Sequence, residues 1–146
     1  MICTQNNLLH GEVHEIKRTC DLVMFEFIFP GKDSVCLHIQ RSFRVLDGDK
    51  LLISYDDMYE PSEKFKKKKF QYDIPGDTLF DDAVKQHRQK LLGAKVSKVY
   101  CSGKDLFLEL DNNIRIEVLE DTVQTGVELY RIFEDNDEFR HFIVET

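Results

Sequence analysis

The residues near the N-terminus whose types could do chemistry are His10, Glu12 and His14, which alternate along a segment expected to be a β-strand. Side chains two positions apart on a strand share a face, and three such groups can bind zinc. Neighbours on one face lie about 7 Å apart, because a strand rises about 3.4 Å per residue. That spacing is too wide for three ligands on an unbent strand, so we predict no metal site and no cofactor.

Catalysis by a nucleophile or at a phosphate loop has no support in the sequence. There is no Gly-x-Ser-x-Gly elbow, no glycine-rich phosphate loop and no CxxC pair. The glycines that stand in polar surroundings have the sequence context of turns, as in Pro30-Gly31 and Asp47-Gly48. We therefore predict that the protein is not an enzyme.

Two acidic segments are candidates for contact with a partner. The chain has 27 Asp and Glu against 20 Lys and Arg, a net charge of −7. This balance favours capture of a basic protein and disfavours general binding to nucleic acid. A solvated acidic surface without a partner is the other interpretation. The predicted contact residues are Asp56, Asp57, Tyr59, Glu60, Glu134, Asp135, Asp137 and Glu138.

One basic cluster stands out, and it supplies the alternative function. Basic residues next to aromatic ones can hold single-stranded nucleic acid by charge and stacking. A solvated loop is the competing interpretation for four lysines in an acidic protein. The residues of this alternative patch are Lys66, Lys67, Lys68, Lys69 and Phe70.

Two arginines occupy similar local sequences, Phe43-Arg44-Val45 and Tyr130-Arg131-Ile132. Each would point to the opposite strand face from its apolar neighbours. They could anchor an acidic loop such as Asp56-Asp57 or Glu134-Asp135, contact a partner, or pair structurally. A third functional interpretation, a small-ligand carrier, requires a pocket lined by His38 or by these two arginines.

These side chains have to be positioned by an internally repeated β-rich unit. Val23-Met24-Phe25-Glu26-Phe27 returns 83 positions later as Leu106-Phe107-Leu108-Glu109-Leu110. The same offset pairs Val13 with Val96 and Ile16 with Val99 without a gap. We predict an α+β fold, mostly β: a duplicated antiparallel β-meander with one helix between the two repeats.

The expected elements follow from periodicity and turn signals. Between the repeats, apolar residues at helical spacing predict a helix over about 77–92, capped by Asp77 and packed across one sheet face. A short strand is expected over 70–74. The other predicted strands are 8–17, 22–29, 34–40, 43–46, 50–54, 94–100, 105–110, 114–119, 128–133 and 139–144. The last of these segments could instead be a short helix capped by Asn136; we prefer the strand, because Phe142, Ile143 and Val144 favour a pleated surface.

Length and composition are those of one soluble domain of 146 residues. We divide it into repeat 1 (about 8–54), a connecting loop and helix (about 55–93) and repeat 2 (about 94–146). No apolar run is long enough for a membrane span, and the N-terminus does not resemble a signal peptide. The scattered cysteines, read as buried small hydrophobes, suggest a reducing cytosol. Exposed edge strands leave monomer and homodimer both open.

Four segments carry a resemblance to a known family. They are Ile53-Ser54-Tyr55-Asp56-Asp57-Met58-Tyr59-Glu60-Pro61, the segment 70–81, Leu129-Tyr130-Arg131-Ile132-Phe133 and His141-Phe142-Ile143-Val144. From about residue 8 onward the chain resembles a family of small bacterial cytosolic proteins, most of them uncharacterised.

Some proteins of that sort are thought to be immunity proteins of polymorphic toxin systems. The resemblance implies a non-catalytic protein that binds and neutralises a basic toxin domain. The expected architecture is also similar to Whirly and PUR-type folds, which are built from duplicated units and bind single strands. That similarity implies the alternative function, at the lysine patch named above.

Overall fold

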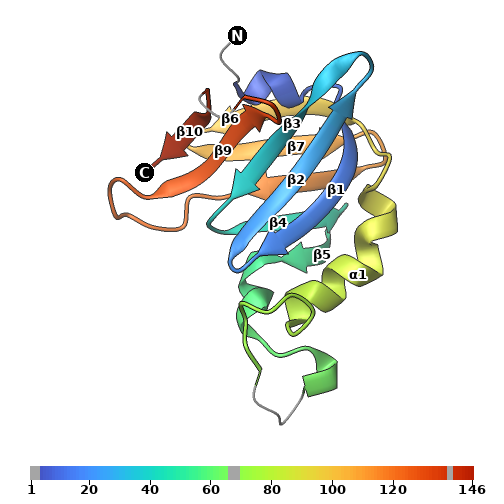
Figure 1. The fold of residues 1–146 in the computed structure, drawn as a ribbon, viewed down its shortest axis with the longest axis vertical. Helices are drawn as coiled ribbons and strands as arrows, with labels where there is room; N and C mark the ends of the chain where they lie inside the picture. Colours follow the sequence, from blue (N-terminus) through green and yellow to red (C-terminus); the bar gives the residue numbers. More distant parts are fainter. Residues whose placement is uncertain (1–3, 66–69, 138–139) are drawn as a thin grey trace.

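The computed structural model describes residues 4–65, 70–137 and 140–146. The described chain forms two antiparallel five-stranded sheets that pack face to face, with their strands crossing (Figure 1). The first sheet has the order β1-β2-β3-β9-β10, with strands Glu12–Thr19, Leu22–Phe29, Lys32–Ile39, Glu128–Glu134 and Phe142–Glu145. The second has the order β5-β4-β8-β7-β6, with strands Lys50–Ser54, Phe43–Asp47, Ile114–Val118, Asp105–Leu110 and Val96–Ser102.

Each sheet combines strands from both halves of the sequence. β9 and β10 extend the sheet begun by β1–β3, while β4 and β5 extend the sheet made by β6–β8. The mostly β, α+β class predicted from the sequence is confirmed.

The strand pairs β1–β2 and β6–β7 have the same register. In the first, β1 is irregular between Val13 and Glu15; in the second, β6 is irregular between Val96 and Lys98. A β-bulge at matched places is a specific backbone feature rather than a consequence of composition. The match is what a duplication would leave, and the duplication itself stays a prediction.

The core lies between the two sheets and consists of alternate side chains. Val23, Phe25 and Phe27 on β2 are fully buried, and Leu106 and Leu108 occupy the matching places on β7. Burying side chains of this size stabilises a fold by about 1.5–3 kcal/mol each. The residues that carried the internal repeat are therefore the residues that hold the sheets together.

The helix α1, Leu79–Leu91, closes one side of the sandwich. It contacts β1 and β5, the edge strands of the two sheets, so the expectation that it crosses one sheet face is wrong. Its cap is Thr78 rather than Asp77, because Thr78 and Asp81 form a reciprocal capping box. No helix in the described part of the chain is long and apolar enough to cross a bilayer.

Two other local expectations are wrong. Residues 70–74 form turns instead of a strand, and Ile74 is exposed. The segment expected to begin the first strand starts as a 3-10 helix, η1 (Gln5–Leu8), since Leu8 turns inward to the core.

The cysteines were also expected to be buried. Cys36 is buried, but Cys20 and Cys101 are exposed. Cys20 lies in the tight turn after β1, and Cys101 lies on the edge strand β6, where neither side chain is covered.

Candidate functional site

The structure places the predicted acidic contacts in two separate regions. Asp56, Asp57 and Tyr59 lie in the 3-10 helix η2 (Tyr55–Tyr59), and Glu60 ends it. Glu134 and Asp135 lie at the far end of β9, where Glu134 pairs with Val35. Glu138 falls outside the described residues.

These two regions lie at opposite ends of β3. The Tyr55 hydroxyl donates to the Gln40 carbonyl just beyond the end of β3, whereas Val35 lies near its start. A strand segment from Val35 to Gln40 spans about 17 Å. The predicted acids therefore form two surfaces rather than one.

A ladder of aromatic rings runs from the core to the surface at the first of these regions. Ring centroids are 6.0 Å apart from Phe43 to Tyr55, 6.4 Å from Tyr55 to Tyr59 and 5.3 Å from Tyr59 to Tyr72. Tyr55 is 5% exposed, while Tyr59 and Tyr72 are 49% and 41% exposed. The outer two rings of the ladder, Tyr59 and Tyr72, face solvent, and the buried rings of Phe43 and Tyr55 lie behind them.

Tyr55 is the fixed point of this ladder. Its hydroxyl donates to the carbonyl oxygens of Asp21 at 2.8 Å and Gln40 at 3.2 Å. Asp21 lies in the turn between β1 and β2, and Gln40 directly follows β3. Burial is the largest cause that raises the pKa of Tyr55 far above its ordinary value. The group is therefore a neutral hydrogen-bond donor at every physiological pH.

A small cavity of about 230 Å³ opens beside the ladder. Arg41 and Asp121 form an ion pair across it at 2.9 Å. The remaining charge in the lining is negative. The lining residues are Asp21, Gln40, Arg41, Tyr55, Asp56, Tyr59 and Asp121.

The carboxylates next to this cavity are not neutralised. Among the residues that the structure describes, Asp56, Asp57 and Glu60 have no cationic partner. Partial burial, followed by the charges of Asp56 and Glu60, raises the pKa of Asp57 above its ordinary value. A cation placed here would relieve that repulsion. We call the surface made by the following residues the tyrosine end: Tyr55, Asp56, Asp57, Tyr59, Glu60 and Tyr72.

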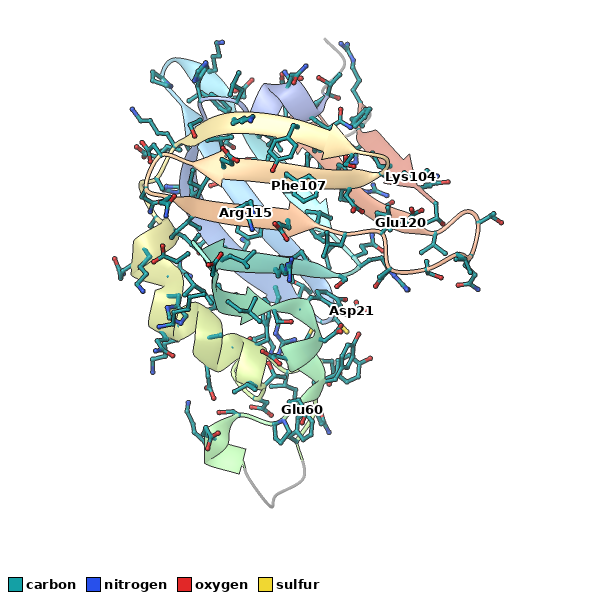
Figure 2. The ribbon with its side chains drawn as sticks, turned by 180° about the vertical axis from the view of Figure 1, so that it is seen from behind. Asp21, Glu60, Lys104, Phe107, Arg115 and Glu120 are labelled. Carbon is teal, nitrogen blue, oxygen red and sulfur yellow. The ribbon has the colours of Figure 1, made fainter. Side chains whose placement is uncertain are left out.

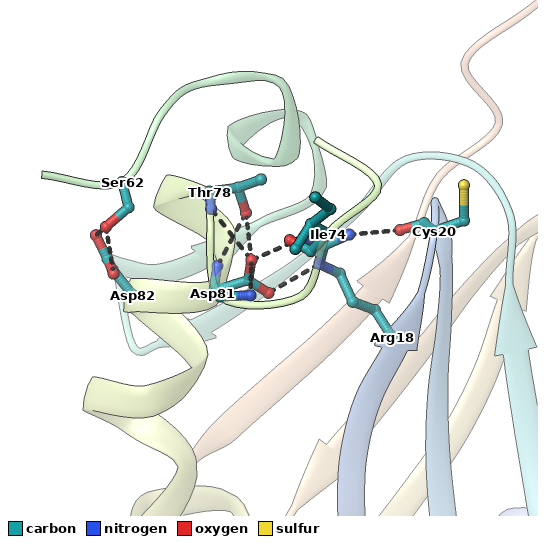
Figure 3. Close-up of polar contacts among 8 residues, drawn as sticks. Arg18, Cys20, Ser62, Ile74, Thr78, Asp81 and Asp82 are labelled. Carbon is teal, nitrogen blue, oxygen red and sulfur yellow. Dashed lines mark hydrogen bonds and ion pairs between the residues drawn. The ribbon is translucent and has the colours of Figure 1, made fainter. Parts of the chain in front are cut away.

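The buried side chain of Arg18 holds the neighbouring loop in place (Figure 3). Arg18 donates from Nε and Nη2 to the Asp81 carboxylate at 2.8 and 2.7 Å. It also donates to the carbonyl oxygens of Cys20 at 2.6 Å and Ile74 at 2.8 Å. One guanidinium thus joins β1, the 70–77 turn and the start of α1, with 2% of its side chain exposed.

A second anchor joins the loop to the first turn of α1. The hydroxyl of buried Ser62 donates to the Asp82 carboxylate at 2.8 Å, and Pro61 forms an isolated bridge with Thr78. The Leu79 amide donates to the Glu60 carbonyl at 2.9 Å. These bonds fix where the chain leaves η2 and hence where Tyr59 and Tyr72 can meet.

This role of Arg18 could not be predicted from the sequence, because the segment from Lys17 to Asp21 has the composition of a polar turn. In the structure β1 continues to Thr19. The irregularity at His14 shifts the alternation, so that Ile16 and Arg18 both point inward.

Arg44 and Arg131 are paired on their own sheets rather than with an acidic loop. Arg44 donates to Glu117 on the adjacent strand at 2.7 Å, and Arg131 bonds Glu128 and the Nδ1 atom of His141. This arrangement agrees with the structural interpretation.

The candidate metal residues do not come together as a ligand set. His10 precedes β1 with a φ of 72°, and His14 lies in the strand irregularity. Among the described residues, the ligand atoms of Glu26, Cys36 and Asp135 all lie within 4.8 Å of one another; these residues come from β2, β3 and the end of β9. Burial, then the charges of Asp135 and Glu26, raises the pKa of Cys36 to about 11, so this thiol is protonated at neutral pH.

Most residues of the alternative nucleic-acid patch are outside the part of the chain that the structure describes. Lys66, Lys67, Lys68 and Lys69 are not among the described residues, and Phe70 is partly buried. The alternative therefore stays a prediction.

No family model matches the chain, and no curated protein or solved structure matches it. Its relation to immunity-type proteins and to Whirly and PUR-type folds accordingly stays a prediction.

Proposed function

We propose that this protein is a non-catalytic binding protein whose tyrosine end binds a cationic segment of a partner protein. The observation that carries the proposal is the meeting of the exposed Tyr59 and Tyr72 rings with unneutralised carboxylates. A basic toxin domain, the partner implied by the family resemblance, would be one such partner.

Physical chemistry favours a lysine or arginine side chain as the contacting group. A cation over a tyrosine ring gains about 0.5–1 kcal/mol at an exposed site and more when desolvated. Asp56 and Asp57 add direct charge complementarity beside that ring. Tyrosine is also enriched among the residues that dominate binding energy at interfaces.

Preorganisation of the surface supports the same function. The Arg18–Asp81 bonds and the Ser62–Asp82 bonds fix the loops before a partner arrives. Binding therefore need not spend free energy on ordering them. The net charge of −7 would in addition accelerate encounter with a cationic partner at low salt.

The test is affinity capture from a native lysate at low ionic strength, with a stepped salt wash. We expect one stoichiometric basic protein, released as the salt rises and absent when the bait is Asp56→Asn/Asp57→Asn/Glu60→Gln. Recovery of nucleic acid, or of a protein retained equally by wild type and the triple variant, would contradict the proposal.

A further inference from the structure

The outer face of the second sheet is open to solvent, and it carries aromatic and cationic side chains (Figure 2). Tyr100, Phe107, Glu117 and Arg44 lie opposite one another across β6, β7, β8 and β4. Arg115 lies two positions from Glu117 on the same face of β8. This surface lies on the sheet, and its part nearest to η2 is Arg44, which pairs with Ser54 at the end of β5.

A buried carboxylate holds two guanidinium groups on this face. Arg44 donates through Nε to Oε1 of Glu117 at 2.7 Å, and Arg115 donates through Nε to Oε2. Burial acts to raise the pKa of Glu117, but the two arginine hydrogen bonds outweigh it and the pKa lies below its ordinary value. Glu117 is therefore a fixed counterion that sets both arginines in place.

The outward ends of both arginines remain available. Their side chains are 47% and 37% exposed, while the Glu117 side chain is 6% exposed. Within the described residues, the terminal Nη atoms of Arg44 and Arg115 donate no hydrogen bond. A guanidinium engaged only at Nε can still receive a carboxylate at its two terminal nitrogens.

An aromatic pair adjoins these arginines. Tyr100 and Phe107 are stacked, with centroids 4.9 Å apart and planes 11° apart. The Nζ atom of Lys98 lies 5.0 Å from the Tyr100 centroid. Phe107 lies opposite Glu117 on the neighbouring strand, so the pair offers apolar contact area next to this carboxylate and its two arginines.

Charge decides which kind of partner this face fits. Its cations are Lys98, Arg44 and Arg115, and its acids are Asp105, Glu109 and Glu117, so the face as a whole is neutral on a protein of net charge −7. Around Glu117, however, two arginines share one carboxylate, and that part of the face is locally positive. A nucleic-acid strand would bring a long row of phosphates against the acidic remainder of the surface. A protein segment with one or two carboxylates needs only the local complement.

We propose that the outer face of β4, β8, β7 and β6 is a second docking surface and that its occupant is an acidic segment of a partner protein. One carboxylate of that segment binds the terminal nitrogens of Arg44 and Arg115. An apolar side chain beside it packs on Tyr100 and Phe107. The segment that it binds has the opposite charge to the cationic segment proposed for the tyrosine end.

The probe is a random twelve-residue peptide library displayed on phage, selected on the intact protein and followed by affinity measurements on the enriched peptides. The test variant is Arg44→Lys/Arg115→Lys, which keeps the charge that neutralises Glu117 but removes the planar forks. Arg131→Lys is the matched control, because Arg131 holds the corresponding position on the other sheet. Equal melting temperatures establish that each variant is folded.

We expect enriched peptides with Asp or Glu next to an aromatic or aliphatic residue, and weakening of about tenfold or more in the double variant but not in the control. Tyr100→Ala tests the apolar contact at an exposed position and should also weaken them. Selection of no peptide, peptides without an acid, or equal binding to the double variant would overturn the proposal. So would an oligothymidine strand that binds this face in place of acidic peptides.

Discussion

At the scale of single residues, the buried guanidinium of Arg18 determines the shape of the tyrosine end. It is almost fully enclosed and bonds one carboxylate and two backbone carbonyl oxygens. Burying a charge is costly unless its partners stay in place, so the loss of one partner is far more damaging than the loss of an exposed ion pair.

We predict that Arg18→Met destabilises the protein by about 3–5 kcal/mol, since the partly buried Asp81 loses its cation and the carbonyl oxygens of Cys20 and Ile74 lose their donor. The measurement is the free energy of unfolding in urea. The control is Lys104→Met at an exposed position, expected to change stability by less than about 0.5 kcal/mol. Equal effects of the two substitutions would contradict a structural role for Arg18.

His87 is a second feature at this scale, since its Nδ1 atom is buried and has no hydrogen-bond partner within the described parts of the chain. Burial, then the charges of Lys90 and Lys50, lowers the pKa of His87 below 6.5. Below pH 6.5 the unfolded chain binds a proton that the folded chain does not, so stability is lost as the pH falls from 6.5 through the lowered pKa.

His87→Leu removes both the orphaned nitrogen and this proton linkage. We expect it to raise the free energy of unfolding by about 1 kcal/mol at about pH 8 and by more at about pH 5.5. Urea unfolding at the two pH values measures the difference. A gain that is the same or smaller at the lower pH would show that His87 does not titrate as described.

At the scale of elements, the two sheets meet where β1 begins. The Val13 amide donates to the Ala94 carbonyl at 2.8 Å, and the Val96 amide donates to the Gly11 carbonyl at 2.9 Å. A Cβ atom on Gly11 would lie 2.8 Å from the Phe29 ring and 2.9 Å from Cβ of Phe27. Glycine is therefore required where the segment that bonds Val96 of the second sheet packs against β2 of the first sheet.

Gly11→Ala should destabilise the protein by about 1–3 kcal/mol through this overlap. A thermal melt or urea titration measures it, with Ser97→Ala on exposed β6 as the control. An unchanged stability would mean that this segment can move away from β2 without cost.

Sequence reasoning succeeded for elements with a strong local pattern. The strands Leu22–Phe29 and Asp105–Leu110 have the predicted bounds, and α1 lies within the predicted helix. The expected strand at 70–74 failed because its backbone is held by turns and by Arg18, a residue far away in the sequence. Local periodicity contains no information about such a contact.

At the scale of the whole molecule, the sequence could not show that β9 and β10 join the sheet of β1–β3 and that β4 and β5 join the sheet of β6–β8. We call this arrangement the exchange of strands between the sheets. Cys36 and Asp135 are neighbours in space and 99 positions apart in sequence. The separation of the two acidic surfaces follows from that exchange, because β9 lies beside β3 and carries Glu134 away from η2. The acidic residues were visible in the sequence, but their grouping depended on topology.

The same topology gives the molecule two surfaces of opposite local charge. The tyrosine end is anionic, and the outer face around Glu117 presents two arginines (Figure 2). In our proposals a cationic segment binds the first surface and an acidic segment binds the second.

The measurement that tests the central claim most directly is the dissociation constant of the captured basic partner for matched charge variants at the two acidic surfaces. The account predicts that Asp56→Asn/Asp57→Asn and Tyr59→Ala each weaken binding about tenfold or more. Glu134→Gln/Asp135→Asn, which removes the same charge at the other end of β3, should leave the dissociation constant unchanged. Weakening by the second pair, with no effect of the first pair or of Tyr59→Ala, would contradict the assignment of the tyrosine end as the binding surface.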